Sequence, residues 1–401
     1  MSFIEELENI DLEIPKGGLS AKIALAKKEK RPLRVKLGLD PTKPDIHLGH
    51  YVVLRVLRKF LKIGAKIFLV VGDFTAMIGD PSGRDKTRPP LTHQEIQRNA
   101  QTYVEQLGRV LDTSKIEVVF NSTWLSKISL ENFIKILAKF NLSEILARDD
   151  FKQRFNGGFP IAMHELIYPL MQAYDSYYLK ADVEIGGSDQ LFNMQMGRSL
   201  QEAFAESAQV IITTPLLIGI DGVNKMSKSL NNYIAITEEP KDIYAKILAI
   251  PDSLIPDYLK LVCDLPKAKK RELLARLQKN VNPFLIKKEL AFQIVCQFYD
   301  KKAAKDSEEY FYRQFEEEDI KKKIYLKKTF SDLGINKEKF TLLDLVFALG
   351  VRNSKSEARR LILQGAVSVN GEKIKDPYFI FKNPKTPLFI RAGQKDFFSI
   401  S

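Results

Sequence analysis

Apolar residues near the front of the chain follow two spacings, which together predict a strand, a helix and a second strand. Residues 34–40 alternate as in a half-buried strand, and apolar side chains recur at helical spacing from Val53 to Leu61. Gly64 is typical of a helix end, and the apolar run at 66–71 reads as a buried strand. This βαβ unit predicts an α/β fold with a doubly wound, Rossmann-like parallel sheet.

The turn between the first strand and the helix carries His47 and His50, with Gly49 between them. The helix is expected to begin at about residue 48, which places both imidazoles beside unpaired backbone N–H groups and the positive end of the helix dipole. Such a turn suits polyphosphate, although the same motif could be a turn with two surface histidines. The chain contains only 4 His, so finding two of them at this turn favours the phosphate site.

Polar segments follow the expected strands. Asp40 ends the first strand, and the segment 72–83 with its Gly-Asp pairs follows the second. Ligands bind at the carboxyl ends of parallel strands, so both segments should bring carboxylates to the rim where the histidine turn lies. Further strands are expected at 116–120, within 181–190, and at 209–218.

Two segments have the residues of a ligand pocket. Tyr168, Gln172 and Asp175 share one face at helical spacing, and a carboxylate among core positions is costly unless it is paired, which favours a polar ligand. Gly187 allows a backbone to press against a nucleoside, and Asp189 can bond ribose hydroxyls.

The second half of the chain begins with a helical pattern over about 237–325. Asn282 and Pro283 form an N-cap and the first residue of one helix. The charge-dense stretch from Glu316 to Lys328 reads as a hinge or linker.

Residues 340–401 read as a separate small α+β module. Thr341 and Ser354 each precede an acidic residue by three positions, the spacing of a capping box that starts a helix. Asn370-Gly371 lies between alternating segments, which predicts a hairpin. A cluster of bases accompanies the second helix: Arg352, Lys355, Arg359 and Arg360.

Composition narrows the class of protein. The 401 residues suffice for two or three domains, and the formal net charge of +12 favours a polyanionic partner, although basic charge alone often reflects solvation. Cys263 and Cys296 have no metal-ligand spacing and read as reduced core residues. The acidic start is unlike a signal peptide, and no apolar run approaches the ~20 residues of a membrane span. We therefore expect a soluble cytoplasmic protein with no membrane partner.

Two motifs give the sequence a family resemblance. Residues 47–50 read His-Leu-Gly-His and residues 225–229 read Lys-Met-Ser-Lys-Ser. They resemble the HIGH and KMSKS motifs of the class I aminoacyl-tRNA synthetases, which bracket ATP. The first differs only by Leu48 for Ile, a volume-conserving exchange. Further segments resemble the tyrosyl members of the class: 79–83, 168–175 and 186–190.

The resemblance implies a role for each motif residue. Implied in catalysis are His47, His50, Lys225, Lys228, Thr42, Arg84 and Arg88. Implied in ATP binding are Gly38, Asp40, Gly49, Gly187, Asp189, Met226 and Ser227. Implied in tyrosine binding are Asp80, Tyr168, Gln172, Asp175 and Gln190, with Asp175 accepting the phenolic hydroxyl. The tail resembles an S4 RNA-binding domain, whose matching bases are Arg352, Lys355, Arg359 and Arg360.

The resemblance also implies the reaction. A tyrosine–tRNA ligase would join tyrosine to AMP and then transfer it to the 3′ end of tRNA-Tyr, with Mg²⁺-ATP as substrate, no tightly bound cofactor and no metal site. The family is generally dimeric through the region corresponding to 92–150, so a homodimer is expected. In one departure, some tyrosyl enzymes have a second hydroxyl partner, a Tyr, where this chain has Lys36.

The expected domains follow from these segments. A catalytic domain covers 1–235 with a connective insertion at about 92–165, a helical anticodon-binding domain covers 236–325, a linker covers 326–339, and the S4-like domain covers 340–401. Three alternatives stay open: a tryptophanyl-type synthetase, a nucleotidylyltransferase with a similar histidine turn, and a non-catalytic RNA-binding relative. The string Gln-Ala-Tyr-Asp at 172–175 favours tyrosine, because tryptophanyl enzymes typically carry Ala at the position of Tyr174.

Overall fold

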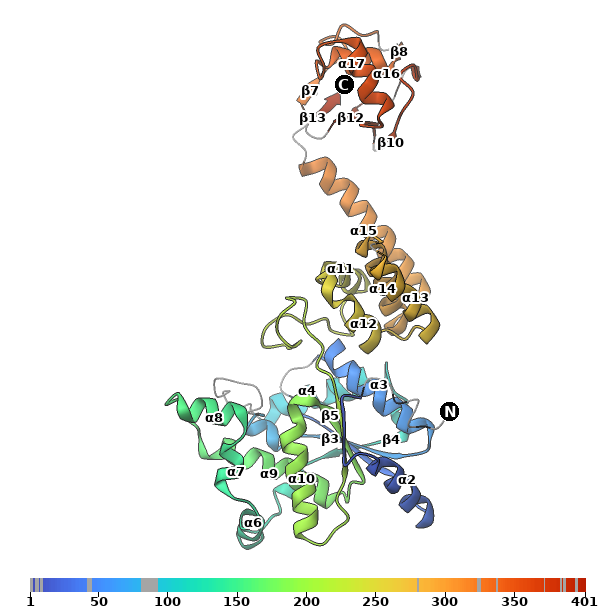
Figure 1. Cartoon of the computed structure of the whole chain (residues 1–401). Helices are drawn as coiled ribbons and strands as arrows, with labels where there is room; N and C mark the ends of the chain where they lie inside the picture. The colour runs from blue at the N-terminus through green and yellow to red at the C-terminus, as the bar shows by residue number, and fades with distance from the viewer. Residues whose placement is uncertain are drawn as a thin grey trace. The chain divides into compact units, whose positions relative to one another are not determined.

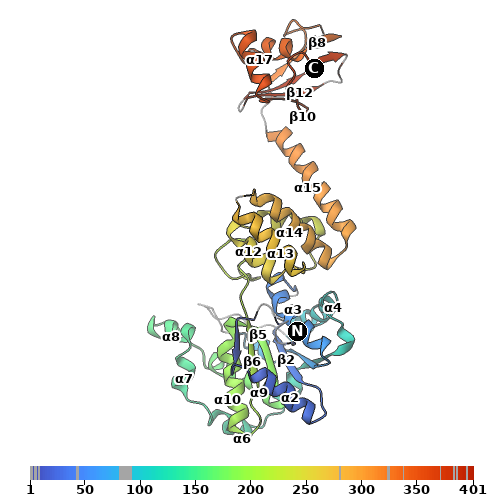
Figure 2. The same ribbon diagram turned by 45° about the vertical axis from the view of Figure 1, so that its right-hand side comes forward.

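The computed structural model places most of the chain. It describes Phe3, Leu7 and residues 10–41, 45–80, 93–279, 281–322, 326–336, 338–370, 372–382, 384, 387–393 and 396–401. The chain divides into two compact units, Met1–Tyr310 and Phe311–Ser401. Figures 1 and 2 show the elements of each unit.

The first unit contains a six-stranded sheet in the order β1-β6-β5-β2-β3-β4. The strands are β1 (Leu12–Ile14), β2 (Arg34–Leu39), β3 (Lys66–Val71), β4 (Ile116–Phe120), β5 (Val183–Gly187) and β6 (Val210–Thr214). All neighbours pair in parallel except β1, which runs antiparallel to β6. The predicted α/β fold with a parallel sheet is confirmed. Strand order reverses between β2 and β5, where ligands of such sheets bind.

The predicted βαβ unit is present, and its helix α3 (Leu48–Lys62) is capped by His47. Of the predicted apolar face, residues 56, 57 and 60 are buried. Of the basic residues on the opposite side, Lys62 is exposed, but Arg55 and Arg58 have a partner. Arg55 and Arg58 both pair with Asp264, at 2.8 Å and 2.7 Å. The periodic pattern shows where the charges lie but cannot reveal a partner 200 positions away.

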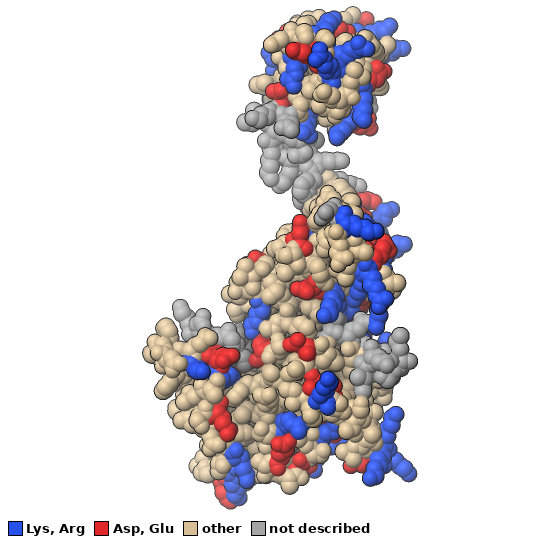
Figure 3. Space-filling view, viewed as in Figure 1, with Lys and Arg blue, Asp and Glu red and all other residues tan. Residues whose placement is uncertain are grey.

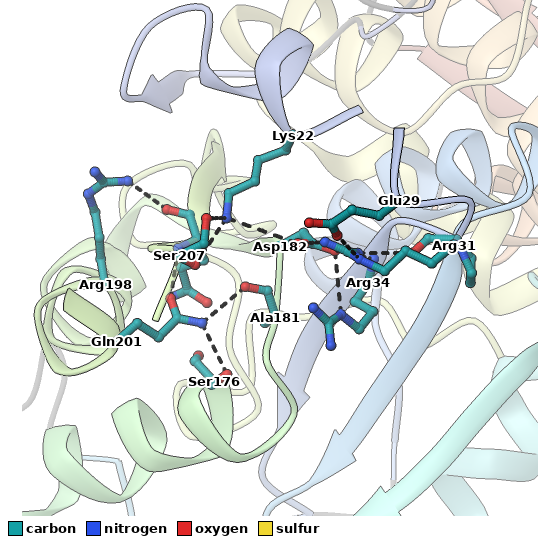
Figure 4. Close-up of polar contacts among 12 residues, drawn as sticks. Lys22, Glu29, Arg31, Arg34, Ser176, Ala181, Asp182, Arg198, Gln201 and Ser207 are labelled. Carbon is teal, nitrogen blue, oxygen red and sulfur yellow. Dashed lines mark hydrogen bonds and ion pairs between the residues drawn. The ribbon is translucent and has the colours of Figure 1, made fainter. Parts of the chain in front are cut away.

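A strand and a helix lie ahead of β2. Helix α2 (Gly18–Lys28) begins after Gly17, and a short strand, β1, precedes it. Buried Asp182 accepts two bonds from the Arg31 guanidinium, accepts another from the Arg34 backbone N–H, and lies 4.0 Å from Lys22 of α2 (Figure 4). Although burial opposes it, the bond from Arg31 holds the pKa of Asp182 below its usual range. This cluster fastens α2 to the sheet.

Between β3 and β5 the chain is mostly helical. The helices are η1 (Thr75–Met77), α4 (His93–Leu107), η2 (Thr113–Lys115), α5 (Ser122–Leu125), α6 (Leu130–Leu137), α7 (Leu142–Leu146), α8 (Asp149–Asn156) and α9 (Met163–Tyr178). The predicted strand at 116–120 is confirmed as β4, but it lies inside the catalytic sheet, beside β3, although it falls within the expected connective insertion. After β5 follow η3 (Ser188–Gln190) and α10 (Leu191–Ala203).

The predicted helical region begins at Pro240. It comprises α11 (Pro240–Ala249), η4 (Asp252–Leu254), α12 (Ile255–Leu261), α13 (Lys267–Gln278), α14 (Pro283–Phe298) and α15 (Lys301–Lys322). The side chain of Asn282 accepts from the backbone N–H of Phe284, which confirms the predicted N-cap. Cys263 is buried, Cys296 is half-buried, and both are free thiols. None of the described helices is long and apolar enough to cross a membrane.

The second unit holds the end of α15, two short helices and two small sheets. Its elements are β7 (Leu326–Lys328), β8 (Lys339–Thr341), α16 (Leu342–Ala348), α17 (Lys355–Leu363), β9 (Val367–Val369), β10 (Glu372–Lys373), β11 (Ile380–Lys382), β12 (Leu388–Ala392) and β13 (Asp396–Ile400). Thr341 and Ser354 cap the two helices as predicted. Gly371 of the predicted hairpin lies outside the described residues, but the strands β9 and β10 on either side of it pair antiparallel as expected.

The expected linker at 326–339 belongs partly to this unit, which corrects the boundary. Strand β7 pairs in parallel with β13, and Phe330 is buried in the same core as Phe340. The strand was missed because its three exposed residues, Leu-Lys-Lys, carry no apolar alternation.

Candidate active site

A cavity of about 780 Å³ opens at the carboxyl ends of the central strands. Every described residue that was predicted to bind ATP or tyrosine or to act in catalysis lines it: Gly38, Asp40, His47, Gly49, His50, Asp80, Tyr168, Gln172, Asp175, Gly187, Asp189, Gln190, Lys225, Met226, Ser227 and Lys228. Three predicted residues, Thr42, Arg84 and Arg88, lie outside the described residues. Segments up to 190 positions apart therefore meet in one site.

The histidine turn forms one end of the cavity. The Nδ1 atom of His47 accepts from the backbone N–H of Gly49 at 3.1 Å, and the Nδ1 atom of His50 accepts from the backbone N–H of His47 at 3.2 Å. The two rings stack with centroids 3.8 Å apart. A Cβ at Gly49 would lie 3.0 Å from the His47 ring, so a side chain there would crowd the stack.

Both imidazoles are neutral. Burial, reinforced by the charge of Lys228, lowers the pKa of His47 to about 3, and burial takes the pKa of His50 well below its usual value. A neutral imidazole that accepts at Nδ1 carries its proton on Nε2. Each ring is thus a neutral Nε2–H donor, and the positive charge of the site comes from elsewhere.

The loop at 225–229 supplies that charge. The Nζ of Lys225 lies 2.7 Å from the carboxylate of Asp189, and the Nζ of Lys228 donates to the hydroxyl of Tyr103 at 2.6 Å. Asn232 braces the loop, because its Oδ1 accepts from the backbone N–H of Ser227 at 2.8 Å. Both ammonium groups therefore border the cavity from the side of the loop.

Carboxylates gather at the other end. Asp40 accepts from the hydroxyls of Tyr168 (2.8 Å) and Thr75 (2.9 Å), and burial together with the nearby Asp80 raises the pKa of Asp40 to about 7. Asp80 accepts from Nε2 of Gln190 at 2.7 Å. This arrangement suits a ligand that brings a positive charge.

Asp175, expected to need a partner, has two that the sequence did not indicate. It accepts from the indole N–H of Trp124 at 2.8 Å and from the side-chain amide of Asn121 at 3.3 Å. Burial raises the pKa of Asp175 to about 6. Trp124 is the single tryptophan of the chain. A single tryptophan in the sequence could have marked this residue as a candidate for the site, but no nearby sequence pattern related it to α9.

Other residues of the site were also missed. Thr75 and Tyr103 line the cavity, as does Glu184, which pairs with the buried ammonium of Lys36 at 2.9 Å. Among the described residues no group of three or more His, Cys, Asp or Glu side chains could hold a metal ion.

The bases predicted to bind RNA lie on and just before α17. Lys355, Arg359 and Arg360 are exposed, whereas Arg352 is half-buried. Figure 3 shows many Lys and Arg side chains over the visible face of this unit. The Arg359 guanidinium also lies 5.8 Å from the ring centroid of exposed Tyr378, an aromatic surface that the sequence reading did not single out.

Comparisons with known proteins agree with this geometry. The family model of class I tRNA synthetases for tryptophan and tyrosine matches residues 27–316, and the S4 domain model matches residues 341–384. The tyrosine–tRNA ligase of Aquifex aeolicus is 44% identical over 373 residues, covering 93% of this chain and 92% of that protein. That of Carboxydothermus hydrogenoformans is 45% identical over 388 residues, covering 96% and 94%. The chain belongs to the tyrosyl-tRNA synthetase family.

Solved structures show the same fold. A truncated mitochondrial tyrosyl-tRNA synthetase from Coccidioides posadasii superposes with a TM-score of 0.60 at 25% identity, over 76% of this chain and 90% of that one. The Archaeoglobus fulgidus enzyme gives 0.60 at 22% identity, over 76% and 99%. Membership of this family disfavours the alternative of a nucleotidylyltransferase. The two relatives compared above are named tyrosine–tRNA ligases, not tryptophan–tRNA ligases.

Proposed function

We propose that the chain is a tyrosine–tRNA ligase that makes tyrosyl-adenylate from tyrosine and ATP and then charges tRNA-Tyr. One observation carries the proposal. A single cavity has two neutral imidazole donors and two lysines at one end, and buried and half-buried carboxylates with a phenol and an amide at the other. The first end fits a polyphosphate, and the second fits an amino acid with an ammonium and a hydroxyl.

In the first step a carboxylate oxygen of tyrosine forms a bond to the α-phosphorus of ATP, and the bond to pyrophosphate breaks. That carboxylate is already ionised at neutral pH, so no general base is needed. Catalysis then rests on positioning and on stabilising the charge that develops on the phosphates. The Nε2–H groups of His47 and His50 donate to phosphate oxygens, and Lys225 and Lys228 supply positive charge. Mg²⁺ enters with ATP as part of the substrate.

The two lysines start from different partners. Lys225 faces the carboxylate of Asp189, the residue assigned to the ribose, and Lys228 faces Tyr103. We assign Gly38, Gly49 and Gly187 to close contacts with the nucleotide, and a Cβ at Gly187 would lie 2.7 Å from Asp189. We also assign Met226 and Ser227 of the loop, together with Asp40, to the binding of ATP.

The part of the cavity that binds the amino acid contacts both the ammonium and the phenolic hydroxyl of tyrosine. Asp80, Tyr168, Gln172 and Gln190 surround the ammonium, and Asp175 accepts the phenolic hydroxyl. The family resemblance assigns Thr42, Arg84 and Arg88 to catalysis, and Arg84 and Arg88 to the phosphates of ATP.

In the second step the terminal ribose hydroxyl of tRNA-Tyr attacks the carbonyl carbon of the adenylate, and AMP leaves. We assign recognition of the tRNA to the second unit, with Arg352, Lys355, Arg359 and Arg360 meeting phosphates, and to the helical region that begins near 236 as the anticodon-binding part. Exposed Phe379, and exposed Tyr378 beside Arg359 of α17, support this, since aromatic side chains stack on unpaired bases. We also assign the protein to the cytoplasm, because charged tRNA is used in protein synthesis and both cysteines are free thiols.

A second copy of the chain is the proposed partner of an apolar surface on α6–α9. Large apolar side chains are unusually exposed there: Leu130 (74%), Ile134 (56%), Leu142 (58%), Phe155 (64%), Phe159 (62%) and Met163 (74%). Exposed apolar groups at this density mark an interaction site. Sedimentation should give a dimer for the wild type, and Phe155→Glu/Phe159→Glu should give a monomer.

Charging of tRNA tests the function directly. Incubation with total tRNA, ATP and a mixture of all amino acids should attach tyrosine alone, identified after release from the RNA. Attachment of tryptophan would overturn the proposal. So would the consumption of ATP with another acceptor when no amino acid is attached to the tRNA.

A further inference from the structure

The ammonium of Lys36 lies behind the wall of the amino-acid pocket. Lys36 stands in β2, is fully buried and does not line the cavity. Its Nζ donates to the backbone oxygen of Gln172 at 2.9 Å, to the hydroxyl of Ser176 at 2.8 Å and to Oε1 of Glu184 at 2.9 Å. An ammonium has three protons, so this geometry leaves none for a substrate atom. Lys36 can act on a substrate only through its neighbours.

Glu184 holds the same neighbours from β5. Its carboxylate accepts from the amide of Gln172 at 3.1 Å, from the hydroxyl of Ser176 at 3.0 Å and from the amide of Gln209. Gln172 and Ser176 are four residues apart, which is about one helical turn. The Lys36–Glu184 pair therefore fixes that turn of α9 against two strands. The same turn carries Asp175.

The pair also sets the charge around Asp175. The charged groups acting on this carboxylate are Lys36 from β2 and Glu184 from β5, with Asp40 at the end of β2 also close enough to interact, while Trp124 and Asn121 are neutral donors. Burial raises the pKa of Asp175, and the charge of Lys36 opposes that rise.

We propose that Lys36 is a positioning residue that determines specificity: it fixes the turn of α9 that reads tyrosine and supplies the positive charge that keeps Asp175 an anionic acceptor for a phenolic hydroxyl. The inference rests on the proposed assignment of Asp175 to that hydroxyl. Phenylalanine has no hydroxyl, so its use depends on the shape of the pocket but not on the charge of Asp175.

The first experiment compares Lys36→Met with the wild type for tyrosine and phenylalanine, by pyrophosphate exchange from pH 5.5 to 8.5. Without the ammonium, Asp175 protonates at higher pH, so the acid limb of kcat/KM for tyrosine should move to higher pH. A shift of one pH unit corresponds to about tenfold lower kcat/KM on that limb. The loss should appear in KM more than in kcat, and the preference for tyrosine over phenylalanine should fall. The phenylalanine profile should keep its shape.

The chain offers a matched control. Lys22 is another buried lysine, paired with buried Asp182 and bonded to Ser207 at 2.8 Å, but neither of these two partners lines the cavity (Figure 4). Lys22→Met should lower thermal stability and leave the acid limb and the preference ratio unchanged. If Lys36→Met does not fold, the double variant Lys36→Met/Glu184→Gln removes both charges of the pair together. The acid limb of its tyrosine profile should still move to higher pH than in the wild type, but by less than the shift expected for Lys36→Met.

Asp175→Asn separates the two possible failures. An unchanged preference ratio in Asp175→Asn would mean that another group reads the hydroxyl, and the proposed site would be wrong. A lowered ratio in Asp175→Asn, together with a wild-type ratio and limb in the Lys36 variant, would overturn the role of Lys36 alone.

Discussion

The Nζ of Lys228 lies 2.6 Å from the hydroxyl of Tyr103 and 4.7 Å from the centroid of its ring. Tyr103 stands on α4, whereas Lys228 belongs to the loop 125 positions later, so this contact joins the loop to the body of the site. It places the ammonium beside the stacked imidazoles, because the ring of Tyr103 also lies 6.5 Å from that of His50.

Lys228→Ala should lower the rate of adenylation by about two to three orders of magnitude, the usual effect of removing one donor to a developing charge. Tyrosine affinity should change little, because the ammonium meets phosphates rather than the amino acid. Single-turnover formation of the adenylate measures the rate. A rate within a few-fold of the wild type would remove Lys228 from the mechanism.

Tyr103→Phe is the companion variant. It keeps the ring beside the ammonium but removes the hydroxyl that accepts from Lys228. We expect the adenylation rate to fall by less than Lys228→Ala lowers it, since the charge is retained. A fall as large as that of Lys228→Ala would mean that the hydroxyl itself is required in the reaction.

His47→Asn should change how stability depends on pH. The pKa of His47 is about 3 in the folded chain and near its ordinary value when unfolded, so between these values the unfolded chain binds the extra proton. Stability from this residue is complete above about pH 6.5 and falls with decreasing pH by up to about 1.4 kcal/mol per pH unit. Asn retains the helix cap without titrating.

Thermal denaturation between pH 7.5 and 5 tests this. The midpoint of the wild type should fall more steeply with decreasing pH than that of His47→Asn. Parallel curves would show that His47 is not held neutral by the fold.

Local signals explain which parts of the fold the sequence predicted. The histidine turn, the caps at Asn282, Thr341 and Ser354, and the strand–helix–strand unit depend on residues within a few positions of one another, and all are present. Short strands such as β1 and β7 escaped because three residues carry too little periodicity.

Partners distant in the chain could not be predicted in the same way. The contact between Trp124 and Asp175 spans 51 positions, and that between Lys36 and Glu184 spans 148. Each depends on how the strands are ordered in the sheet, which no local pattern specifies. The sequence therefore indicated that Asp175 needed a partner but not which residue it was.

Truncation before Leu326, which removes β7 and everything after it, should separate the two halves of the reaction. Tyrosine-dependent pyrophosphate exchange should stay near the full rate, because no described residue that lines the cavity lies beyond 230. Charging should fall through weaker tRNA binding, and the remaining affinity should depend less steeply on salt, since fewer phosphates are neutralised. Unchanged charging would make the unit dispensable, and loss of exchange would show that the first unit needs it.

The cut must precede β7. Truncation before residue 340 would leave β7 without its partner β13 and Phe330 without its core, so that variant should bind more of a dye for exposed apolar surface than the cut before Leu326. Equal dye binding by the two truncations would contradict the revised boundary.

The most direct test of the whole account is the exchange of labelled pyrophosphate into ATP, measured with each standard amino acid in turn. Exchange requires the phosphate end and the amino-acid end of the cavity to work together, and it does not involve tRNA. The account predicts exchange with tyrosine and with no other amino acid at comparable concentration. Exchange driven by tryptophan, or equal exchange with phenylalanine, would contradict it.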